Sequence, residues 1–282
     1  MDTGLQRSIT AHLDNTVDNV LLRVREKANL FYGSEIASTG NGTASPFAKM
    51  LFPQIKLLSM VERSYSASIG TTYNYIARDL TRHAYGNGEL EYKVEGELPV
   101  SVLALIDSIV DNYRGTGHAS PDTPAELRRI RAAIAAASPG EERRTKSFKS
   151  DVFFVDDKRV ENFIEIKTPQ PNYDTCKAIK TRILTVHALR HPSRVNARVA
   201  FPHNPNGILG DYAWPPSRYW LDAKVDWAVN GVPLMGAGLW NYLGNSPDTF
   251  ADILGCCAEV FERRGAEVTA ELDAVVFGAE AL

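Results

Sequence analysis

The chain has 282 residues, of which 44% are hydrophobic and 23% charged, so it is long enough to bury a large core. Its 20 glycines and 15 prolines, alongside this hydrophobic content, exclude collagen-like and broadly disordered proteins. The net charge of −3 excludes a polycationic nucleic-acid coat, although it says nothing about a local groove. The uninterrupted apolar stretches are far shorter than the roughly 18 residues of a membrane span, so we expect no membrane partner.

The cysteines and the first residues indicate the cell compartment. Cys176, Cys256 and Cys257 cannot form a disulfide framework, and none of them has the spacing of a zinc motif. Asp2 stands where a signal peptide carries positive charge, and no apolar segment follows it. We therefore expect a cytoplasmic protein in a reducing environment.

The first half of the chain is predicted to be mainly helical. Apolar residues at spacings of three and four predict helices over the first thirty residues and over 55–83, with a polar loop at 33–45 between them. Two shorter helices are predicted over 100–113 and 124–137, the second with Pro124 in its first turn.

The pattern changes after Lys146. A short apolar strand at 151–156 and an alternating strand at 162–167 predict an antiparallel hairpin, followed by a helix at 173–189 and a strand at 196–201. A strand near 225–229 and helices around Leu239 and over 247–264 complete the prediction. The fold class is therefore α/β (α+β), a central mixed sheet flanked by helices in one domain over 1–282. Its parts are a mainly helical part at 1–145, an α/β core at 146–235 and a C-terminal helical part at 236–282.

The hairpin carries the residues with catalytic potential. Glu165 and Lys167 flank Ile166 and share one face of a strand, because alternate residues of a strand point the same way. Thirteen residues separate Asp151 from Glu165, and hairpin pairing can bring Asp151 beside this pair. Two converging carboxylates suit Mg²⁺, and a lysine beside them can orient the attacking water and stabilise developing negative charge. The pattern favours phosphodiester hydrolysis, and the alternative is a solvated polar face of an amphipathic hairpin.

Four blocks of sequence resemble known nucleases. Ser150-Asp151, thirteen residues and then Glu165-Ile166-Lys167 resemble the PD-(D/E)XK signature, with Ser150 where proline often stands. Further blocks, in order, resemble type II restriction endonucleases: Glu62-Arg63-Ser64-Tyr65-Ser66 with Ile69-Gly70-Thr71, then Glu165 to Asn172, Phe201 to Gly207, and Gly238-Leu239-Trp240. The chain resembles the branch of these endonucleases that includes enzymes cutting interrupted palindromes such as GGNCC.

The resemblance implies a restriction-endonuclease-like core and a role for each matching residue. Asp151 and Glu165 would be metal ligands, together with the backbone carbonyl of Ile166, and Lys167 would be the catalytic lysine. Glu62 matches a helical glutamate that contributes to the active site in related enzymes, although it equally fits an exposed, ion-paired helix charge. A permuted variant of the superfamily uses a Lys-x-Asp arrangement, which Lys149-Ser150-Asp151 imitates.

Two stretches of positive charge are candidates for contacts with DNA phosphates. Between residues 177 and 198 there is no acidic residue, and the cations are Lys177, Lys180, Arg182, Arg190, Arg194 and Arg198, with His187 and His191 among them. A second basic run comprises Arg128, Arg129, Arg131, Arg143, Arg144, Lys146 and Lys149. Such runs are usually solvated faces. Asn172, His203 and Asn204 are further candidates for DNA contacts, although loop asparagines are more often turn formers.

These observations predict a Mg²⁺-dependent type II restriction endonuclease. It would cut double-stranded DNA at a palindromic site and leave 5′-phosphate ends, and the two-fold symmetry of such a site calls for a homodimer. Two alternatives stay open: a repair or recombination nuclease of the same superfamily, and a non-catalytic DNA-binding protein on the same fold.

Overall fold

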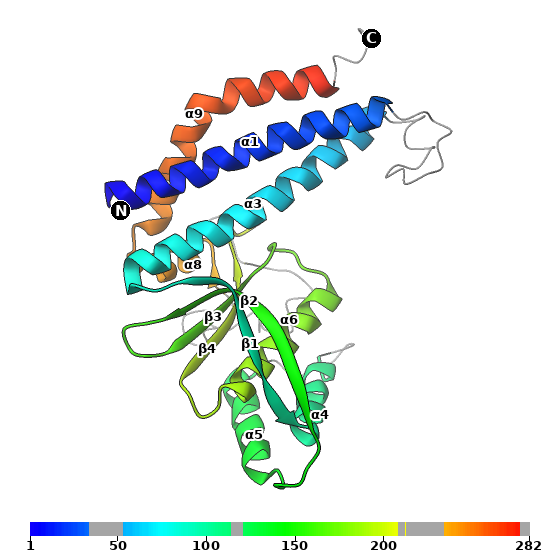
Figure 1. Cartoon of the computed structure of the whole chain (residues 1–282), viewed down its shortest axis with the longest axis vertical. Coiled ribbons are helices and arrows are strands. Elements are labelled where there is room, and N and C mark those ends of the chain that lie inside the picture. The colour runs from blue at the N-terminus through cyan, green and yellow to red at the C-terminus, as the bar shows by residue number, and fades with distance from the viewer. Residues whose placement is uncertain (34–52, 114–120, 208–211, 213–233, 277–282) are drawn as a thin grey trace. The chain divides into compact units, whose positions relative to one another are not determined.

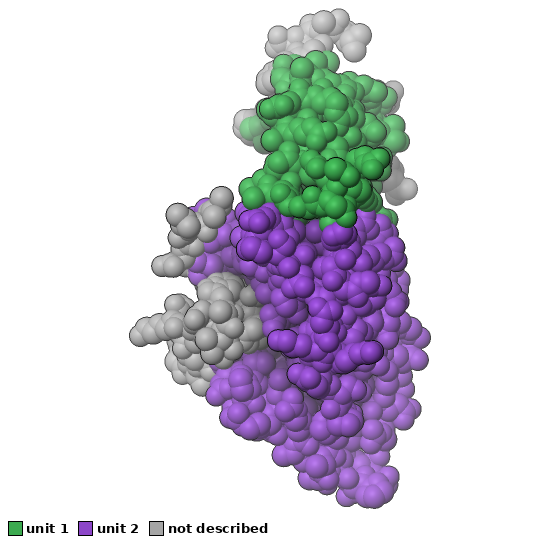
Figure 2. Space-filling model, turned by 90° about the vertical axis from the view of Figure 1, so that its left-hand side faces the viewer, with its two compact units in different colours: residues 1–76, 251–282 green, residues 77–250 purple. Residues whose placement is uncertain are grey.

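The computed structural model describes residues 1–33, 53–113, 121–207, 212 and 234–276. The chain divides into two compact units, shown in different colours in Figure 2. The helical unit comprises Met1–Ile76 and Ala251–Leu282, and the sheet unit comprises Ala77–Phe250. The strand predicted near 225–229 lies outside the described residues, as does nearly all of the loop predicted at 33–45.

In its described residues the helical unit has three long helices (Figure 1): α1 (Thr3–Gly33), the part of α3 (Pro53–Tyr85) up to Ile76, and α9 (Thr249–Val276) from Ala251. Val20 and Val24 of α1 pack with Val61 of α3, and Leu272 of α9 covers them. At the surface, Arg25 donates two hydrogen bonds to the carboxylate of Glu271. The predicted helices are thus confirmed, and α9 continues well beyond the predicted end at residue 264.

The sheet unit is built on one five-stranded mixed sheet in the order β1-β2-β3-β4-β5. The strands are β1 (Glu89–Pro99), β2 (Arg143–Val155), β3 (Glu161–Ile166), β4 (Val195–Phe201) and the short β5 (Leu234–Met235). β1, β2 and β3 are antiparallel, whereas β3, β4 and β5 are parallel. The predicted class, a mixed sheet with helices and an N-terminal helical part, is confirmed.

One face of this sheet is covered by helices whose apolar residues form the main core. They are α4 (Val100–Asp111), α5 (Thr123–Ala136) and α6 (Tyr173–Leu189), which Figure 1 shows beside the strands. Phe153, Phe163 and Val199 of the sheet are buried against Ile183 and other residues of α6. The helix α6 starts where the sequence predicts because the side chain of Asn172 accepts a hydrogen bond from Thr175 N and caps it.

The other face of the sheet carries an aromatic and polar cluster. Phe154 is fully buried, and its ring contacts the rings of Tyr85 and of Tyr242, which lies on α8 (Ala237–Gly244). The Tyr242 hydroxyl donates to Asn162 of β3 at 2.5 Å, and Trp240 donates from its indole nitrogen to Pro202 O. These contacts hold α8 against the strands that carry the candidate site.

The sequence predicts no strand before Asp151, and the structure corrects this: β1 is a strand and β2 begins at Arg143. The two strands pair over ten positions, with acidic side chains concentrated on β1 and basic ones on this part of β2. Lys149 of β2, for example, forms an ion pair of 2.6 Å with Glu91 of β1. Charge complementarity across strands supports this pairing without a clean hydrophobic alternation, which is why the pattern was missed.

No helix of the described ranges combines the length and the apolar character needed to cross a membrane.

Candidate active site

The hairpin formed by β2 and β3 places Asp151 beside Glu165. The last pair of its ladder is Val152 with Ile164, so one further step sets Asp151 opposite Glu165. Beyond Val152 the link between the two strands is made by a side chain: Asp151 Oδ2 accepts a hydrogen bond of 2.8 Å from Ile166 N. The carboxylate is thereby fixed at the point where the two strands separate.

Lys167 brings the two carboxylates together. Its backbone nitrogen donates to Ala200 O of β4 at 2.9 Å, which keeps the chain extended just past the end of β3. Its Nζ lies 2.7 Å from Glu165 Oε1 and 3.2 Å from Asp151 Oδ2. The structure therefore gathers Asp151, Glu165 and Lys167 at one place. The side chains of Asp151 and Lys167 are 25% and 32% exposed, whereas that of Glu165 is 7% exposed, so the cluster is open to solvent on one side.

The charges of this cluster act on one another. Burial and the negative charge of Glu165 raise the pKa of Asp151, and the positive charge of Lys167 offsets part of this rise. Burial alone would lower the pKa of Lys167, but Glu165 and Asp151 outweigh it, so the pKa of Lys167 is raised. Lys167 is consequently a stable ammonium group at neutral pH, suited to holding negative charge or orienting a water molecule.

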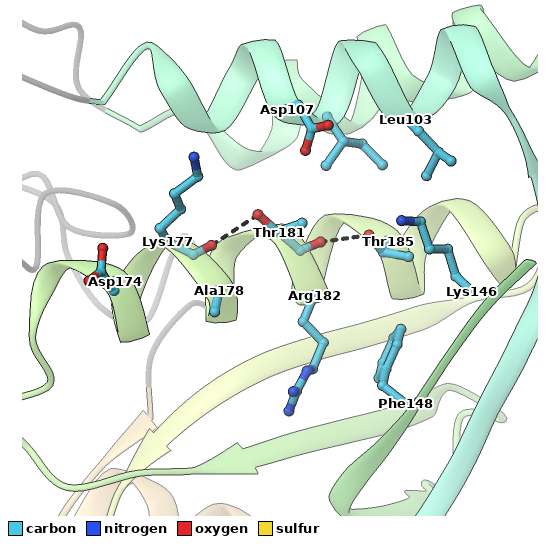
Figure 3. Close-up of a pocket in the computed structure, with 11 residues that line it drawn as sticks. Leu103, Asp107, Lys146, Phe148, Asp174, Lys177, Ala178, Thr181, Arg182 and Thr185 are labelled. Carbon is cyan, nitrogen blue, oxygen red and sulfur yellow. Dashed lines mark hydrogen bonds between the residues drawn. The ribbon is translucent and has the colours of Figure 1, made fainter. Parts of the chain in front are cut away.

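Arg182 of α6 is a further member of the site. Its Nη1 donates to Glu165 Oε1 at 2.5 Å, and its guanidinium lies over the ring of Phe148. Figure 3 shows the side chain reaching from α6 toward the sheet beside Phe148, at the edge of a cleft of about 550 Å³ that Lys146 and Lys177 also line. The sequence predicts Arg182 only as a phosphate contact. Its helical spacing with the buried Ile179 and Val186 was the available signal that it faces the sheet.

The prediction for Lys180 is wrong, because this lysine is not on the surface. Its side chain is fully buried, and its Nζ lies 2.5 Å from Glu126 Oε2 of α5. Tyr113 donates to the other carboxylate oxygen of Glu126, and its ring lies below the ammonium group. Burial lowers the pKa of Lys180. A side chain enclosed in this way cannot reach a DNA phosphate.

The remaining predicted DNA contacts are spread over the sheet unit. Lys177 forms an ion pair of 2.8 Å with Asp111, and Arg190 lies near Glu161 and over the ring of Tyr92. Asn172 is the cap of α6, the turn-forming role that the sequence left open. His203 is exposed after β4, and Asn204 accepts a hydrogen bond from Asn206 N. None of these contacts joins the residue to Asp151, Glu165 or Lys167.

Glu62 belongs to the helical unit. It is exposed on α3 and accepts a hydrogen bond of 2.6 Å from the hydroxyl of Ser66, one helical turn away. A role for Glu62 in the active site stays a prediction.

The donor set of the cluster fits a hard divalent cation. The carboxylates of Asp151 and Glu165 converge on one ammonium group, at 3.2 and 2.7 Å, and oxygen donors are those that Mg²⁺ prefers. Among the described residues no group of three His, Cys, Asp or Glu side chains is placed to hold a metal. A cation here would therefore depend on Asp151, Glu165, backbone oxygen and water, which is usual for Mg²⁺.

A mixed sheet that ends in two carboxylates and a lysine is an arrangement suited to cleaving phosphodiesters. Comparison with known families agrees: the family model for the type II restriction endonuclease HinfI matches residues 5–261. The chain belongs to the HinfI family of type II restriction endonucleases. It is accordingly a site-specific deoxyribonuclease, and its partner is DNA.

Individual relatives are also type II restriction enzymes, all from Herpetosiphon aurantiacus. HgiEI is 26% identical over 239 residues, and HgiBI is 24% identical over 237, in both cases covering 82% of each chain. HgiCII is 25% identical over 240 residues, which cover 84% of each chain. The similarity thus extends over most of the length of all these proteins.

The buried pair of Lys180 and Glu126 gives a stability prediction. Glu126→Ala should lower the free energy of unfolding by about 3–5 kcal/mol, because it leaves a buried ammonium group without its counter-charge. The double variant Glu126→Leu with Lys180→Met should lose less, since it removes both charges. Urea unfolding followed by circular dichroism measures both, and a double variant less stable than the single one would contradict this account.

Proposed function

We propose that this enzyme uses Mg²⁺ to cut both strands of a palindromic DNA sequence, leaving 5′-phosphate and 3′-hydroxyl ends. The observation that carries the proposal is the convergence of Asp151 and Glu165 on the ammonium group of Lys167. DNA binding alone requires no such set, which argues against a non-catalytic protein. Membership of a restriction-enzyme family argues against a repair or recombination nuclease.

Each residue has a part that follows from its surroundings. Asp151, Glu165 and the carbonyl oxygen of Ile166 would hold the metal ion. Bound Mg²⁺ supplies acidification of a coordinated water and neutralisation of charge on the phosphoryl group. Lys167, which stays protonated, orients the attacking water and stabilises the negative charge that develops on the phosphate. Arg182 holds the Glu165 carboxylate in place through its hydrogen bond.

The proposal also covers the oligomeric state, the cell compartment and the remaining contacts with DNA. A palindrome has two-fold symmetry, so two copies of the chain, each cutting one strand, match it. Cytoplasmic location is proposed because all three cysteines are free thiols, as a reducing compartment maintains them. Phosphate contacts from Lys177, Arg190 and His203, and contacts from Asn172 and Asn204, remain part of the proposal.

Plasmid digestion tests the activity directly. With Mg²⁺ the protein should produce discrete fragments whose sequenced ends share one palindrome, and the ends should accept ligation without prior phosphorylation because they carry 5′-phosphates. With EDTA the plasmid should stay intact. Sequence-independent degradation, or a preference for a four-way junction, would instead indicate a repair or recombination nuclease. The same sequences test the expectation of a GGNCC-like site.

Replacement of the lysine tests the mechanism. Lys167→Ala should slow cleavage by at least about 100-fold, because it removes a charge that stabilises the transition state, while DNA binding in Ca²⁺ persists. Lys149→Ala is a matched control: its ammonium group pairs with Glu91 on β1, so cleavage should continue. If the permuted Lys149-Ser150-Asp151 arrangement were the catalytic one, Lys149→Ala would slow cleavage and Lys167→Ala would not.

The oligomeric state is a separate test. Analytical ultracentrifugation should give a species of twice the 31.1 kDa chain mass, at least when the protein is bound to its site. A mixed dimer of wild-type and Lys167→Ala chains should nick one strand only. A monomer that cuts both strands in one binding event would contradict the proposed division of work.

A further inference from the structure

We infer that α5, the end of α6 and the start of β4 form a phosphate-binding pocket that docks DNA outside the site of cleavage. The start of one basic run and the end of the other meet there, although nearly sixty residues separate Arg131 from His187 in the chain. The hollows concerned measure about 420 and 440 Å³ and share Arg131 and His187. The "basic pocket" is defined by Arg128, Arg131, His187, His191, Arg194 and Arg198.

The basic pocket lacks negative charge among the described residues. No acidic side chain of the described chain lines either hollow, and no described carboxylate forms an ion pair with any of its four arginines. Arg194 donates to the carbonyl oxygen of Lys158, and Arg198 lies over the ring of Tyr242. By contrast, Lys177, Lys180 and Arg182 of the same basic stretch each have an acidic partner.

The electrostatics of His187 agree with an uncompensated positive field. Burial, followed by the charges of Arg131, Lys180 and Arg198, lowers the pKa of His187 to about 4. Burial also lowers the pKa of Arg198. An oxyanion in the pocket would offset the cost of keeping these cations close together, and the neutral imidazole of His187 could still donate one hydrogen bond to it.

The ligand that fits is a phosphate group, and DNA is its expected source because the enzyme acts on DNA. The pocket extends along β4 from Val195 to Arg198, and Glu165 is level with Val199, so the outer end of the pocket at Val195 lies four residues from the level of the carboxylate. At about 3.3 Å per residue this outer end is roughly 13 Å from Glu165, which corresponds to about four base-pair steps. A phosphate bound at the outer end, beside Arg131 and Arg194, is therefore not the one that is cut but one that lies outside it.

Salt dependence of DNA binding tests this inference. Affinity is measured in Ca²⁺, for a long duplex carrying the mapped site and for a short duplex trimmed to that site, over a series of NaCl concentrations. Arg131→Gln and Arg194→Gln should each reduce the slope of log K against log[salt] by about 0.9 with the long duplex. Arg129→Gln, on the same helix but outside the pocket, should leave the slope unchanged. Thermal unfolding confirms that each variant is folded, and Arg131 is exposed, so its replacement should be tolerated.

The outcomes separate the possible sources of the phosphate. Equal slopes for the wild type, Arg131→Gln and Arg194→Gln would overturn DNA docking at the pocket, as would an equal loss of slope in Arg129→Gln. If inorganic phosphate raises the melting temperature of the wild type but not of Arg131→Gln while the DNA slopes agree, the site takes free phosphate and DNA is not its ligand. Because binding is read in Ca²⁺, these results do not depend on whether the proposed Mg²⁺ mechanism is correct.

Discussion

The candidate site depends on one hydrogen bond, from Ile166 N to the carboxylate of Asp151. Without it, only the longer contact of 3.2 Å with Lys167 would hold the Asp151 side chain where β2 and β3 separate. With it, Asp151 is held opposite Glu165, so two negatively charged carboxylates lie close to each other. Burial, and then the negative charge of Glu165, raise the pKa of Asp151. Lys167 and Arg182 supply the positive charge that makes the arrangement stable.

The helix α6 connects the core to the chemistry. One side of it buries Ile183 and Leu184 in the main core, and Arg182, next in sequence, reaches the carboxylate of Glu165. Further along, the same helix supplies His187 to the basic pocket. The packing that orients α6 thus also sets the positions of Arg182 and His187. A small movement of α6 would displace both side chains.

Much of this organisation could be predicted from sequence. The hairpin, the helix at 173–189 and the strand after it follow from periodicity and turn residues, and the capping Asn172 marks where the helix begins. The spacing of Asp151 and Glu165 was enough to predict their convergence. β1 could not be recognised because its pairing with β2 depends on charges that meet only after folding. Lys180 was misplaced for a similar reason, since Glu126, which permits its burial, lies 54 residues earlier in the chain.

The pairing of Glu165 with both Lys167 and Arg182 affects the net charge that DNA meets at the candidate site. Carboxylates gathered for a cation would otherwise repel the sugar-phosphate chain that must approach them. Lys167 and Arg182 set two positive charges against the two carboxylates, so the four side chains together are nearly neutral. A metal ion at the proposed site would have to displace these tethered ammonium and guanidinium groups from Glu165. DNA could then be bound before the metal ion that cleavage requires.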